Sequence, residues 1–180
     1  KLLKNIDGTP LIRNIVLEIT KSDLDSCSIV LGYQSDKVAD VIKDLNINLI
    51  LNPMWKEGQA SSLKAALNSL TSSYSDLLVM LGDLPGIKSG HINRIIEEHL
   101  SSENRRSKIT IPSFKGEKGN PVIWGKSFFH DLSNLEGDVG GRVLFSQHPA
   151  AINLIEMDDP SVVTDTDTPE DFEHFLANRA

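Results

Sequence analysis

Short apolar segments alternate along this chain with longer segments in which apolar residues recur every three or four positions. The most apolar short segment, residues 77–81, runs directly into Gly82, Asp83, Leu84 and Pro85. Five consecutive apolar residues bounded by turn residues are typical of a strand buried on both faces, as in a parallel sheet covered by helices. Other short strands are expected at residues 28–32, 48–51, 109–112, 122–124 and 152–157.

The longer segments predict amphipathic helices between these strands. Thr9 and Pro10 are expected to cap and begin the first helix, which carries Leu11, Ile12, Ile15, Val16 and Ile19 on one face. Further helices are expected to begin at Ser35 or Asp36, at Ser61 or Ser62, at Ser89, around Gly140 and at Thr168. Strands that alternate with helices in this way indicate the α/β class, with βαβ units and a mostly parallel sheet.

Length and composition favour a single domain over residues 1–180. The chain is 39% hydrophobic and 24% charged, which suits one globular domain with a sizeable core. The net charge of -7 argues against a partner that is nucleic acid or an anionic membrane, but leaves room for a local basic pocket for phosphates. Because the single cysteine, Cys27, cannot form an internal disulfide and no apolar stretch reaches the ~20 residues of a membrane span, we expect a cytoplasmic protein.

Asp83 is the first candidate for chemistry, because it stands where a buried strand leaves the core. Open α/β sheets bind ligands outside the carboxyl ends of their strands, so an acid there can hold a metal ion. Asp165 and Asp167 precede the last helix and can meet Asp83 at that edge, where separated carboxylates would hold Mg²⁺. The alternative is ordinary turn chemistry, which Asp-Leu-Pro also fits.

Three polar, glycine-containing segments are further candidates. Gly58 precedes Ser61 and Ser62 at a helix start, where free N–H groups suit a phosphate or a nucleobase edge, although Ser is a preferred cap without any ligand. Residues 119–121 form a polar loop or a simple turn. In residues 137–142, three glycines allow close approach of a ligand, and Arg142 can bind an anion with two hydrogen bonds.

Common alternatives lack their motifs. The five histidines show no metal-ligand spacing, and no cysteine partners them, which argues against zinc. Gly-x-Ser-x-Gly, Gly-Lys-Ser/Thr and Gly-x-Gly-x-x-Gly after a strand are all missing from these residues. Acids, glycines and cations without an evident nucleophile fit phosphoryl chemistry, in which charge neutralisation and positioning do most of the work.

The order of these segments resembles the MobA-like nucleotidyltransferases, and within them most closely the molybdenum-cofactor cytidylyltransferases. The segments that carry the resemblance are residues 1–3, 7–12, 58–63, 82–85, 119–121, 137–142 and 165–171. The resemblance implies a three-layer Rossmann-like fold of the nucleotide-diphospho-sugar transferase type. It also implies that an N-terminal strand and a glycine-rich loop, ending at Lys1, belong before this sequence.

The implied activity is transfer of a nucleoside monophosphate from an NTP, here CTP, to a phosphorylated, molybdopterin-type acceptor, with release of pyrophosphate and with Mg²⁺ as cofactor. The resemblance assigns Lys1 and Asp83 to catalysis, and Asp83 with Asp167, or Asp165 in its place, to the metal. It assigns Lys1, Gly58, Ser61, Ser62 and Asp83 to the nucleotide, and Gly119, Asn120, Asp138 and Arg142 to the acceptor.

Two alternatives to this reading stay open. One keeps the chemistry and changes the acceptor to a sugar phosphate or another phosphorylated metabolite. The other is a non-catalytic module that senses nucleotides or serves as an accessory to a molybdenum enzyme. For the nucleotidyltransferase itself, transient contact with a molybdenum enzyme is a further expected partnership.

Overall fold

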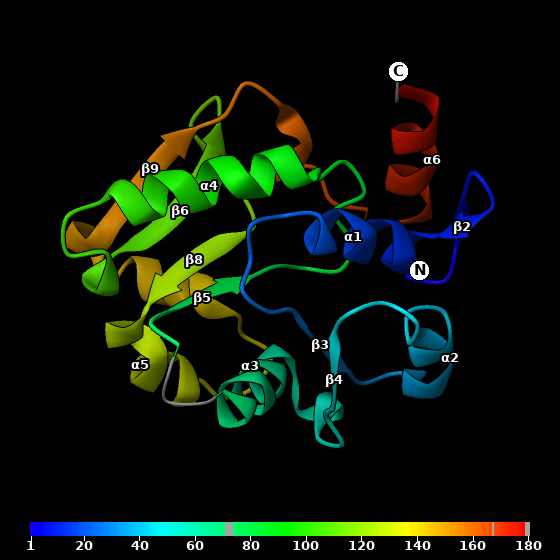
Figure 1. Cartoon of the computed structure of the whole chain (residues 1–180), viewed down its shortest axis with the longest axis horizontal. Coiled ribbons are helices and arrows are strands. Elements are labelled where there is room, and N and C mark those ends of the chain that lie inside the picture. The colour runs from blue at the N-terminus through cyan, green and yellow to red at the C-terminus, as the bar shows by residue number, and fades with distance from the viewer. Residues whose placement is uncertain (71–73, 167, 179–180) are drawn as a thin grey trace.

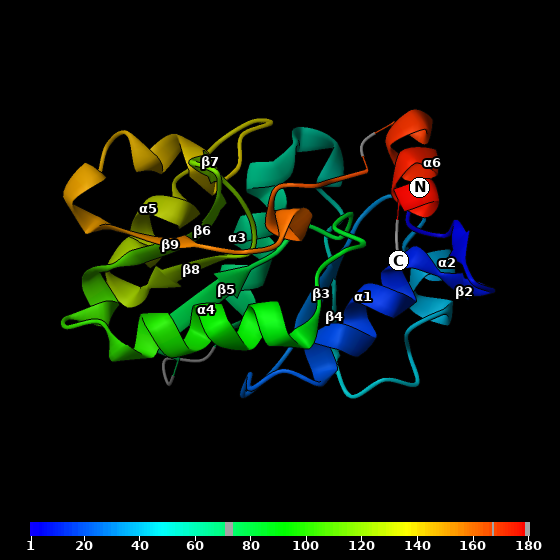
Figure 2. The same cartoon turned by 90° about the horizontal axis from the view of Figure 1, so that it is seen from above.

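The strands lie between two layers of helices in the computed structural model, which describes residues 1–70, 74–166 and 168–178. Helices α1 (Leu11–Thr20) and α4 (Ser89–Ser101) lie on one side of the strands, and α3 (Gln59–Ser69) and α5 (Phe129–Ser133) on the other (Figures 1 and 2). The α/β class and the layered arrangement expected from the sequence are confirmed. In the described part of the chain, no helix is both long and apolar enough to cross a membrane.

The N-terminal residues form a small hairpin where the sequence predicted the first turn of a helix. Strand β1 (Asn5–Ile6) pairs antiparallel with β2 (Thr9–Pro10), and α1 begins only at Leu11. The prediction was wrong for Thr9 and Pro10 because Asp7 and Gly8 both have positive φ, 51° and 80°. Asp-Gly with two positive φ angles makes the tight turn that joins antiparallel strands.

The next two strands are parallel neighbours. Strand β3 (Ser28–Leu31) pairs in parallel with β4 (Asn48–Leu51), and α2 (Ser35–Asp40) connects them. Apolar spacing favoured a helix that continues to Leu45, but α2 ends at Asp40 and the chain continues in turns. Ile42 is nevertheless fully buried, which explains why its apolar character appeared in the helical pattern.

The five-residue apolar segment forms a strand at the end of the mixed sheet, with a short extension. Strand β5 covers Asp76–Val79, and Met80 and Leu81 continue beyond it toward Asp83. Helix α3, which precedes β5, begins at Gln59, two or three residues earlier than the expected start at Ser61 or Ser62. Helix α4 follows β5 and begins at Ser89 as expected.

A mixed sheet forms the second half. Strands β6 (Ile109–Phe114), β8 (Val122–Gly125) and β9 (Ile152–Glu156) were expected, and β7 (Glu117–Lys118) forms a short hairpin with β6. Strand β8 lies antiparallel between β5 and β6, whereas β9 runs parallel to β6. Strands β5, β6 and β9 therefore share one direction and β8 opposes them, because the segment from β6 to β8 is too short for a crossover helix.

The remaining elements are 3-10 segments and the C-terminal helix. Residues 140–146, expected to be a helix, form a single 3-10 segment, Gly141–Phe145. Helix α6 (Pro169–Asn178) begins where Thr168 and Pro169 predicted, and the Asp171 carboxylate bonds to the Thr168 amide and hydroxyl. Shorter 3-10 segments cover Trp55–Glu57, Arg105–Ser107, Lys126–Phe128, Pro149–Ala151 and Pro160–Val162.

A buried polar cluster links α4 to the mixed sheet. The imidazole of His99, 1% exposed, lies 2.8 Å from the Thr110 hydroxyl on β6 and 3.1 Å from the Asp76 carboxylate on β5. Burial by itself raises the pKa of Asp76, but hydrogen bonds from Ser75, His99 and Arg105 outweigh it and lower that pKa overall. The cluster lies where β5 begins, at the opposite end of that strand from Asp83.

Candidate functional site

Asp83 lies just after β5, and its two carboxylate oxygens have different surroundings. The Oδ2 atom accepts a hydrogen bond from Lys1 Nζ at 2.7 Å, and the side chains of Lys1 and Asp83 are 30% and 19% exposed. The Oδ1 atom is buried and has no hydrogen-bond partner among the described residues. Burial of a carboxylate oxygen without a hydrogen-bond donor costs stability. This atom is therefore well suited to coordinate a cation.

Thr166 attaches the segment before α6 to the same position. Its amide and its hydroxyl both donate to the main-chain oxygen of Asp83, each at 3.1 Å, and Thr166 is fully buried. The expected approach of the Asp165 region to Asp83 is therefore present, and the Asp165 side chain is exposed. Asp167, the expected second metal ligand, lies outside the described residues.

The donor set near Asp83 fits a metal ion shared with a substrate. Among the described residues, no group of three or more His, Cys, Asp or Glu side chains is arranged to hold a metal. Magnesium keeps several waters and binds through one or two carboxylates and the phosphates of a substrate. The Asp83 carboxylate, with one oxygen that no described residue contacts by a hydrogen bond, lies beside a segment whose sequence is rich in aspartate and so meets that requirement.

The start of α3 is joined to the loop of residues 137–142, a contact that the sequence did not reveal. The amide of Gln59 donates to Asp138 Oδ1 at 3.1 Å, and the amide of Ala60 donates to the Gly137 carbonyl at 3.2 Å. The N–H groups of Gln59 and Ala60, at the helix start that we expected to be free for a phosphate, are thus already satisfied. Gly58 has a φ of 101°, and a Cβ atom there would collide with the Asp138 backbone.

Asn52 is the site residue that sequence reasoning missed. It follows β4, is 2% exposed, and its amide nitrogen donates to the hydroxyls of Ser61 (2.8 Å) and Ser62 (3.1 Å). Its oxygen accepts from the Met54 amide at 3.0 Å, while Ser61 donates to the Gly58 carbonyl at 2.8 Å. The position of Asn52 at the carboxyl end of a parallel strand was the signal that could have identified it.

The predicted acceptor residues lie in two loops. The amides of Gly119 and Asn120 donate to the carbonyls of Pro112 and Val162, both at 2.7 Å, and the Asn120–Pro121 peptide bond is cis. A Cβ atom on Gly119 would collide with the Val162 carbonyl, so glycine allows this close approach. Arg142 Nη2 donates to the Lys118 carbonyl at 3.1 Å, which brings the two loops together.

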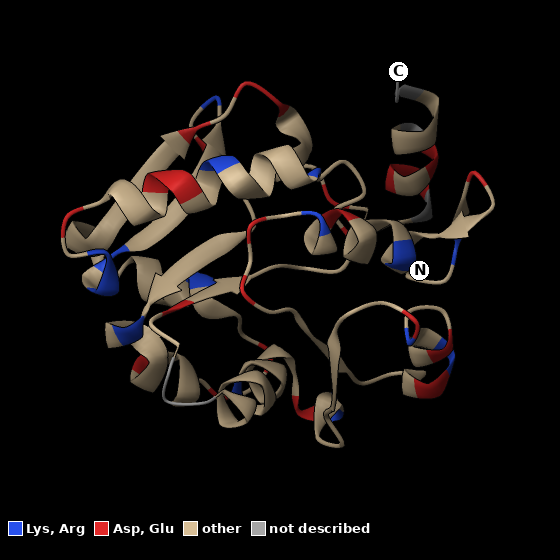
Figure 3. Ribbon diagram, in the orientation of Figure 1, with Lys and Arg blue, Asp and Glu red and all other residues tan. Residues whose placement is uncertain are grey.

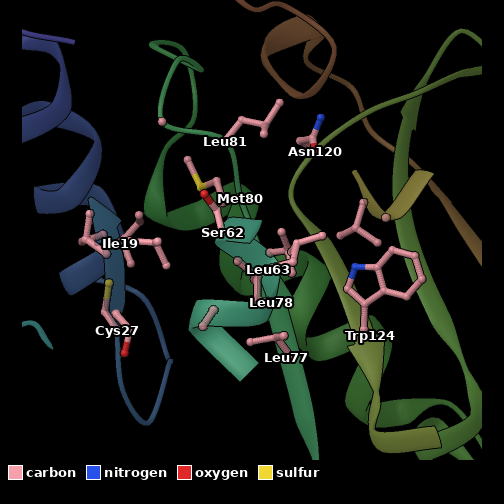
Figure 4. A pocket seen from close by; sticks show the side chains of 18 of the residues that line it. Ile19, Cys27, Ser62, Leu63, Leu77, Leu78, Met80, Leu81, Asn120 and Trp124 are labelled. Atoms are coloured by element: carbon pink, nitrogen blue, oxygen red, sulfur yellow. The ribbon is translucent and has the colours of Figure 1, made fainter. Parts of the chain in front are cut away.

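A cavity of about 590 Å³ connects part of these candidates. Ser62, Asn120 and Arg142 line it, together with Leu2 and Gly82, the chain neighbours of Lys1 and Asp83. Figure 4 shows Ser62 beside Met80, with Asn120 and Leu81 at one end of the cavity. Charged residues lie mainly on the helices and loops around the strands (Figure 3), and the cavity wall is mostly apolar.

The layered fold, with an acid just past the carboxyl end of β5, defines an α/β protein with a candidate ligand site at the ends of its strands. The sequence matches the family described as MobA-like NTP transferase domain over residues 1–152, and the chain belongs to that family.

Solved structures share the fold of this chain. The chain resembles the crystal structure of an Rv0371c homologue from Mycobacterium sp. strain JC1, with a TM-score of 0.84 and 24% identity over 98% of this chain and 86% of that one. It also resembles Rv0371c from Mycobacterium tuberculosis H37Rv in complex with manganese, with a TM-score of 0.81, 20% identity and coverage of 99% and 92%.

Among curated proteins, the bifunctional protein GlmU of Prochlorococcus marinus is 24% identical over 136 residues. These residues are 76% of this chain and 29% of GlmU, so the chain spans less than a third of that relative.

Proposed function

We propose that this protein transfers a nucleoside monophosphate from an NTP to a phosphorylated acceptor and releases pyrophosphate. The observation that carries the proposal is Asp83, just past β5, with Lys1 on one carboxylate oxygen and no hydrogen-bond partner among the described residues on the other, buried oxygen. Family membership supports the same chemistry. The cytoplasm, where phosphorylated metabolites and NTPs are available, is the proposed compartment, and the lone Cys27 is consistent with it.

Asp83 would hold the divalent cation, with Asp167 or Asp165 as the second protein ligand. Bound there, Mg²⁺ would supply charge neutralisation on the phosphates of the nucleotide. The Rv0371c structure in complex with manganese supports a divalent metal in a protein of the same fold. The buried Oδ1 atom of Asp83, which has no hydrogen-bond partner in the described part of the chain, would be the atom that binds the cation.

The protein's own residues position the phosphates and neutralise the departing charge. An acceptor phosphate oxygen attacks the α-phosphorus, the bond from that phosphorus to the bridging oxygen breaks, and its electron pair leaves with pyrophosphate. Lys1 Nζ, beside Asp83, would neutralise the charge that grows on pyrophosphate. Gly58, Ser61 and Ser62 would hold the nucleotide, with Asn52 fixing both hydroxyls.

For the acceptor we propose a molybdopterin-type phosphate, with CTP as the nucleotide and a molybdenum enzyme as a transient partner. The sequence resemblance to the cytidylyltransferase branch supports this choice. Gly119, Asn120, Asp138 and Arg142 would face the acceptor, and the contact of Arg142 with the Lys118 carbonyl places two of the loops side by side. A sugar phosphate or another phosphorylated metabolite is the second candidate, because the same chemistry would serve any phosphorylated acceptor.

Pyrophosphate release tests the proposed reaction. With Mg²⁺, each NTP and each acceptor, Asp83→Asn should lower turnover by about 10²-fold or more, because the amide cannot replace a charged ligand. Asp158→Asn is the matched control, since that side chain is 95% exposed and pairs on the surface with Arg94. Undiminished turnover of Asp83→Asn would remove Asp83 from the mechanism. A folded protein without turnover on any NTP would favour the non-catalytic module.

A further inference from the structure

Exposed apolar side chains gather around strand β4. Of the eight large apolar side chains that are exposed among the described residues, five belong to this corner, with exposed fractions between 37% and 68%. These five form the β4 patch: Tyr33, Leu49, Leu51, Met54 and Trp55. A contiguous exposed apolar patch marks a surface at which a protein binds a partner.

The β4 patch is continuous from the strand to the turn beyond it. Leu51 is the register partner of Leu31 on β3, two residues before Tyr33. The ring centroids of Tyr33 and Trp55 are 5.5 Å apart, and Trp55 packs so closely on Gly32 that a Cβ atom there would collide with it. The aromatic pair therefore extends the apolar surface past the carboxyl ends of β3 and β4.

Strand β4 also has an edge that pairs with no strand in the described part of the chain. It pairs with β3 alone, and the amides of Asn48 and Asn52 donate to carbonyls on that side, each at 2.8 Å. Because the direction of bonding alternates along a strand, the N–H and C=O groups of Leu49 and Leu51 point to the open edge. The edge thus offers backbone donors and acceptors beside exposed leucines.

This edge lacks the protection that strand edges in native proteins usually have. Edges are commonly protected by charged side chains. Strand β9, which pairs with β6 alone among the described strands, contains Glu156 and is followed by Asp158 and Asp159. Residues 45–55 contain no charged side chain, although 24% of the chain is charged. Since an open apolar edge promotes aggregation, we expect the β4 edge to be covered in the native protein.

Charge favours a second copy of the chain as the cover. The net charge of -7 makes two copies repel each other, and the uncharged β4 segment is a surface at which they can meet without opposed charges. The flanks add no net repulsion. Before β4, Lys43 pairs with Asp40 at 2.7 Å and Arg13 pairs with Asp44 at 2.6 Å. After the uncharged segment, one cation and one acid follow at positions 56 and 57.

Symmetry makes the β4 edge complementary to itself. When β4 pairs antiparallel with the same strand of a second copy, around a two-fold axis at Ile50, Leu49 lies opposite Leu51 of the partner subunit. Both leucines have their backbone groups on the open edge, so each such pair can exchange two hydrogen bonds. A two-fold interface requires this kind of match, in which one surface fits its own copy.

The rest of the β4 patch supplies the area that edge pairing lacks. Stable interfaces bury roughly 800 Å² on each partner, which is more than two leucines provide. Tyr33, Met54 and Trp55 lie at the carboxyl end of β4, and aromatic and methionine side chains are enriched at interfaces.

We propose that this protein forms a two-fold symmetric dimer through the edge of β4. The β3–β4 pair of one copy and that of the other make one four-stranded sheet, and the β4 patch packs around the junction. The proposal does not depend on the reaction assigned to Asp83.

Sedimentation velocity over a series of protein concentrations tests the proposal. We expect the wild-type protein to dimerise and Leu51→Lys to raise the dissociation constant about tenfold or more, because it places a charge at the paired edge. Leu154→Lys is the matched control, since this leucine is 48% exposed on β9, outside the β4 patch, and its variant should dimerise like the wild type. Both side chains are exposed, so the melting temperature should show that each variant is folded.

A disulfide tests the arrangement of the two strands. The axis at Ile50 would bring its Cβ atom within about 5 Å of the same atom in the other copy. Under mild oxidation, Ile50→Cys should therefore form a covalent dimer. The wild-type protein, whose half-buried Cys27 lies outside the β4 patch, should not.

Four results would overturn the proposal. A wild-type protein that stays monomeric at every concentration would leave the edge to a different partner. Unchanged association of Leu51→Lys, or an equal loss in Leu154→Lys, would place the contact elsewhere, and a dimer in which Ile50→Cys forms no disulfide would exclude the edge pairing. Each readout concerns assembly and not turnover, so failure here leaves the proposed reaction to be decided by its own assay.

Discussion

At the scale of single residues, the structure separates side chains that share a segment but not a role. Ser61 and Ser62 both accept from Asn52, yet only Ser61 also donates to the Gly58 carbonyl, whereas Ser62 lines the cavity. The sequence indicated the two hydroxyls and Asp83, because serines at a helix start and an acid after an apolar strand are local patterns. Asn52 was missed because its partners are nine and ten residues away in the sequence.

Replacement of Asn52 should show how much this buried amide stabilises the fold. Asn52→Ala leaves Ser61, Ser62 and the Met54 amide without their partner, and we expect the free energy of unfolding to fall by about 1–3 kcal/mol. Asn48→Ala, at the exposed start of β4, should change it by less than about 0.5 kcal/mol. Urea titrations of both variants measure the difference. Equal effects would show that the Asn52 hydrogen bonds are not what stabilises this corner.

At the scale of elements, contacts between distant segments position the site. Helix α3 begins against residues 137–138, and the segment before α6 begins against the Asp83 carbonyl. Periodicity predicted that these helices exist, and the Thr168 and Pro169 signals located α6 correctly. It could not predict which loop caps α3, because the pairing of Gln59 with Asp138 spans 79 residues and leaves no local pattern.

Gly58 should be the least replaceable glycine at this junction. Gly58→Ala imposes a positive φ on a residue with a side chain and forces its Cβ into the Asp138 backbone, so we expect a loss of about 1–3 kcal/mol or more in unfolding free energy. Gly90→Ala, inside α4 with open space around the added methyl group, should be neutral or stabilise by up to about 1 kcal/mol. Thermal unfolding compares the two, and a neutral Gly58→Ala would contradict the packing described here.

The His99 cluster predicts a pH dependence for the junction of α4, β5 and β6. The pKa of Asp76 is lowered in the folded protein, so its contribution to stability is fully present above its ordinary pKa of about 4 and is lost as pH falls through the lowered folded value. Asp76→Asn should therefore destabilise the protein at pH 7 and progressively less as the pH approaches 3. Unfolding free energies measured across that range decide it, and a destabilisation independent of pH would refute the assignment.

At the scale of the whole molecule, alternation of strands and helices predicted the fold class but not the reversed strand. The sequence of strand β8 is as apolar as that of a parallel strand, because Val122, Ile123 and Trp124 are all buried although they point to alternate faces. Only the turn at Lys115 and Gly116, both with positive φ, reveals the change of direction, and that turn can be placed only after the strands are known. The cavity between β3 and β5 was likewise invisible to local patterns.

The molecule as a whole presents its candidate residues at one edge, where β3, β4 and β5 end. Lys1, Asp83 and Thr166 are linked there by hydrogen bonds, Asn52 lies at the end of β4, and a cavity extends from this edge along the strands. This arrangement leads to a specific expectation about binding. A nucleotide and a divalent cation should bind together, through Asp83, and neither should bind as well alone.

The melting temperature tests this expectation most directly. It is measured with Mg²⁺ and each of CTP, GTP, ATP and UTP, on the protein and on its Asp83→Asn variant. A ligand that binds only the folded state must raise the melting temperature. We predict a rise that requires Mg²⁺ and nucleotide together, is largest with CTP, and is lost in Asp83→Asn. An equal rise in the variant, or no rise with any nucleotide in a folded protein, would contradict the central claim that Asp83 is the metal ligand of a nucleotidyltransferase.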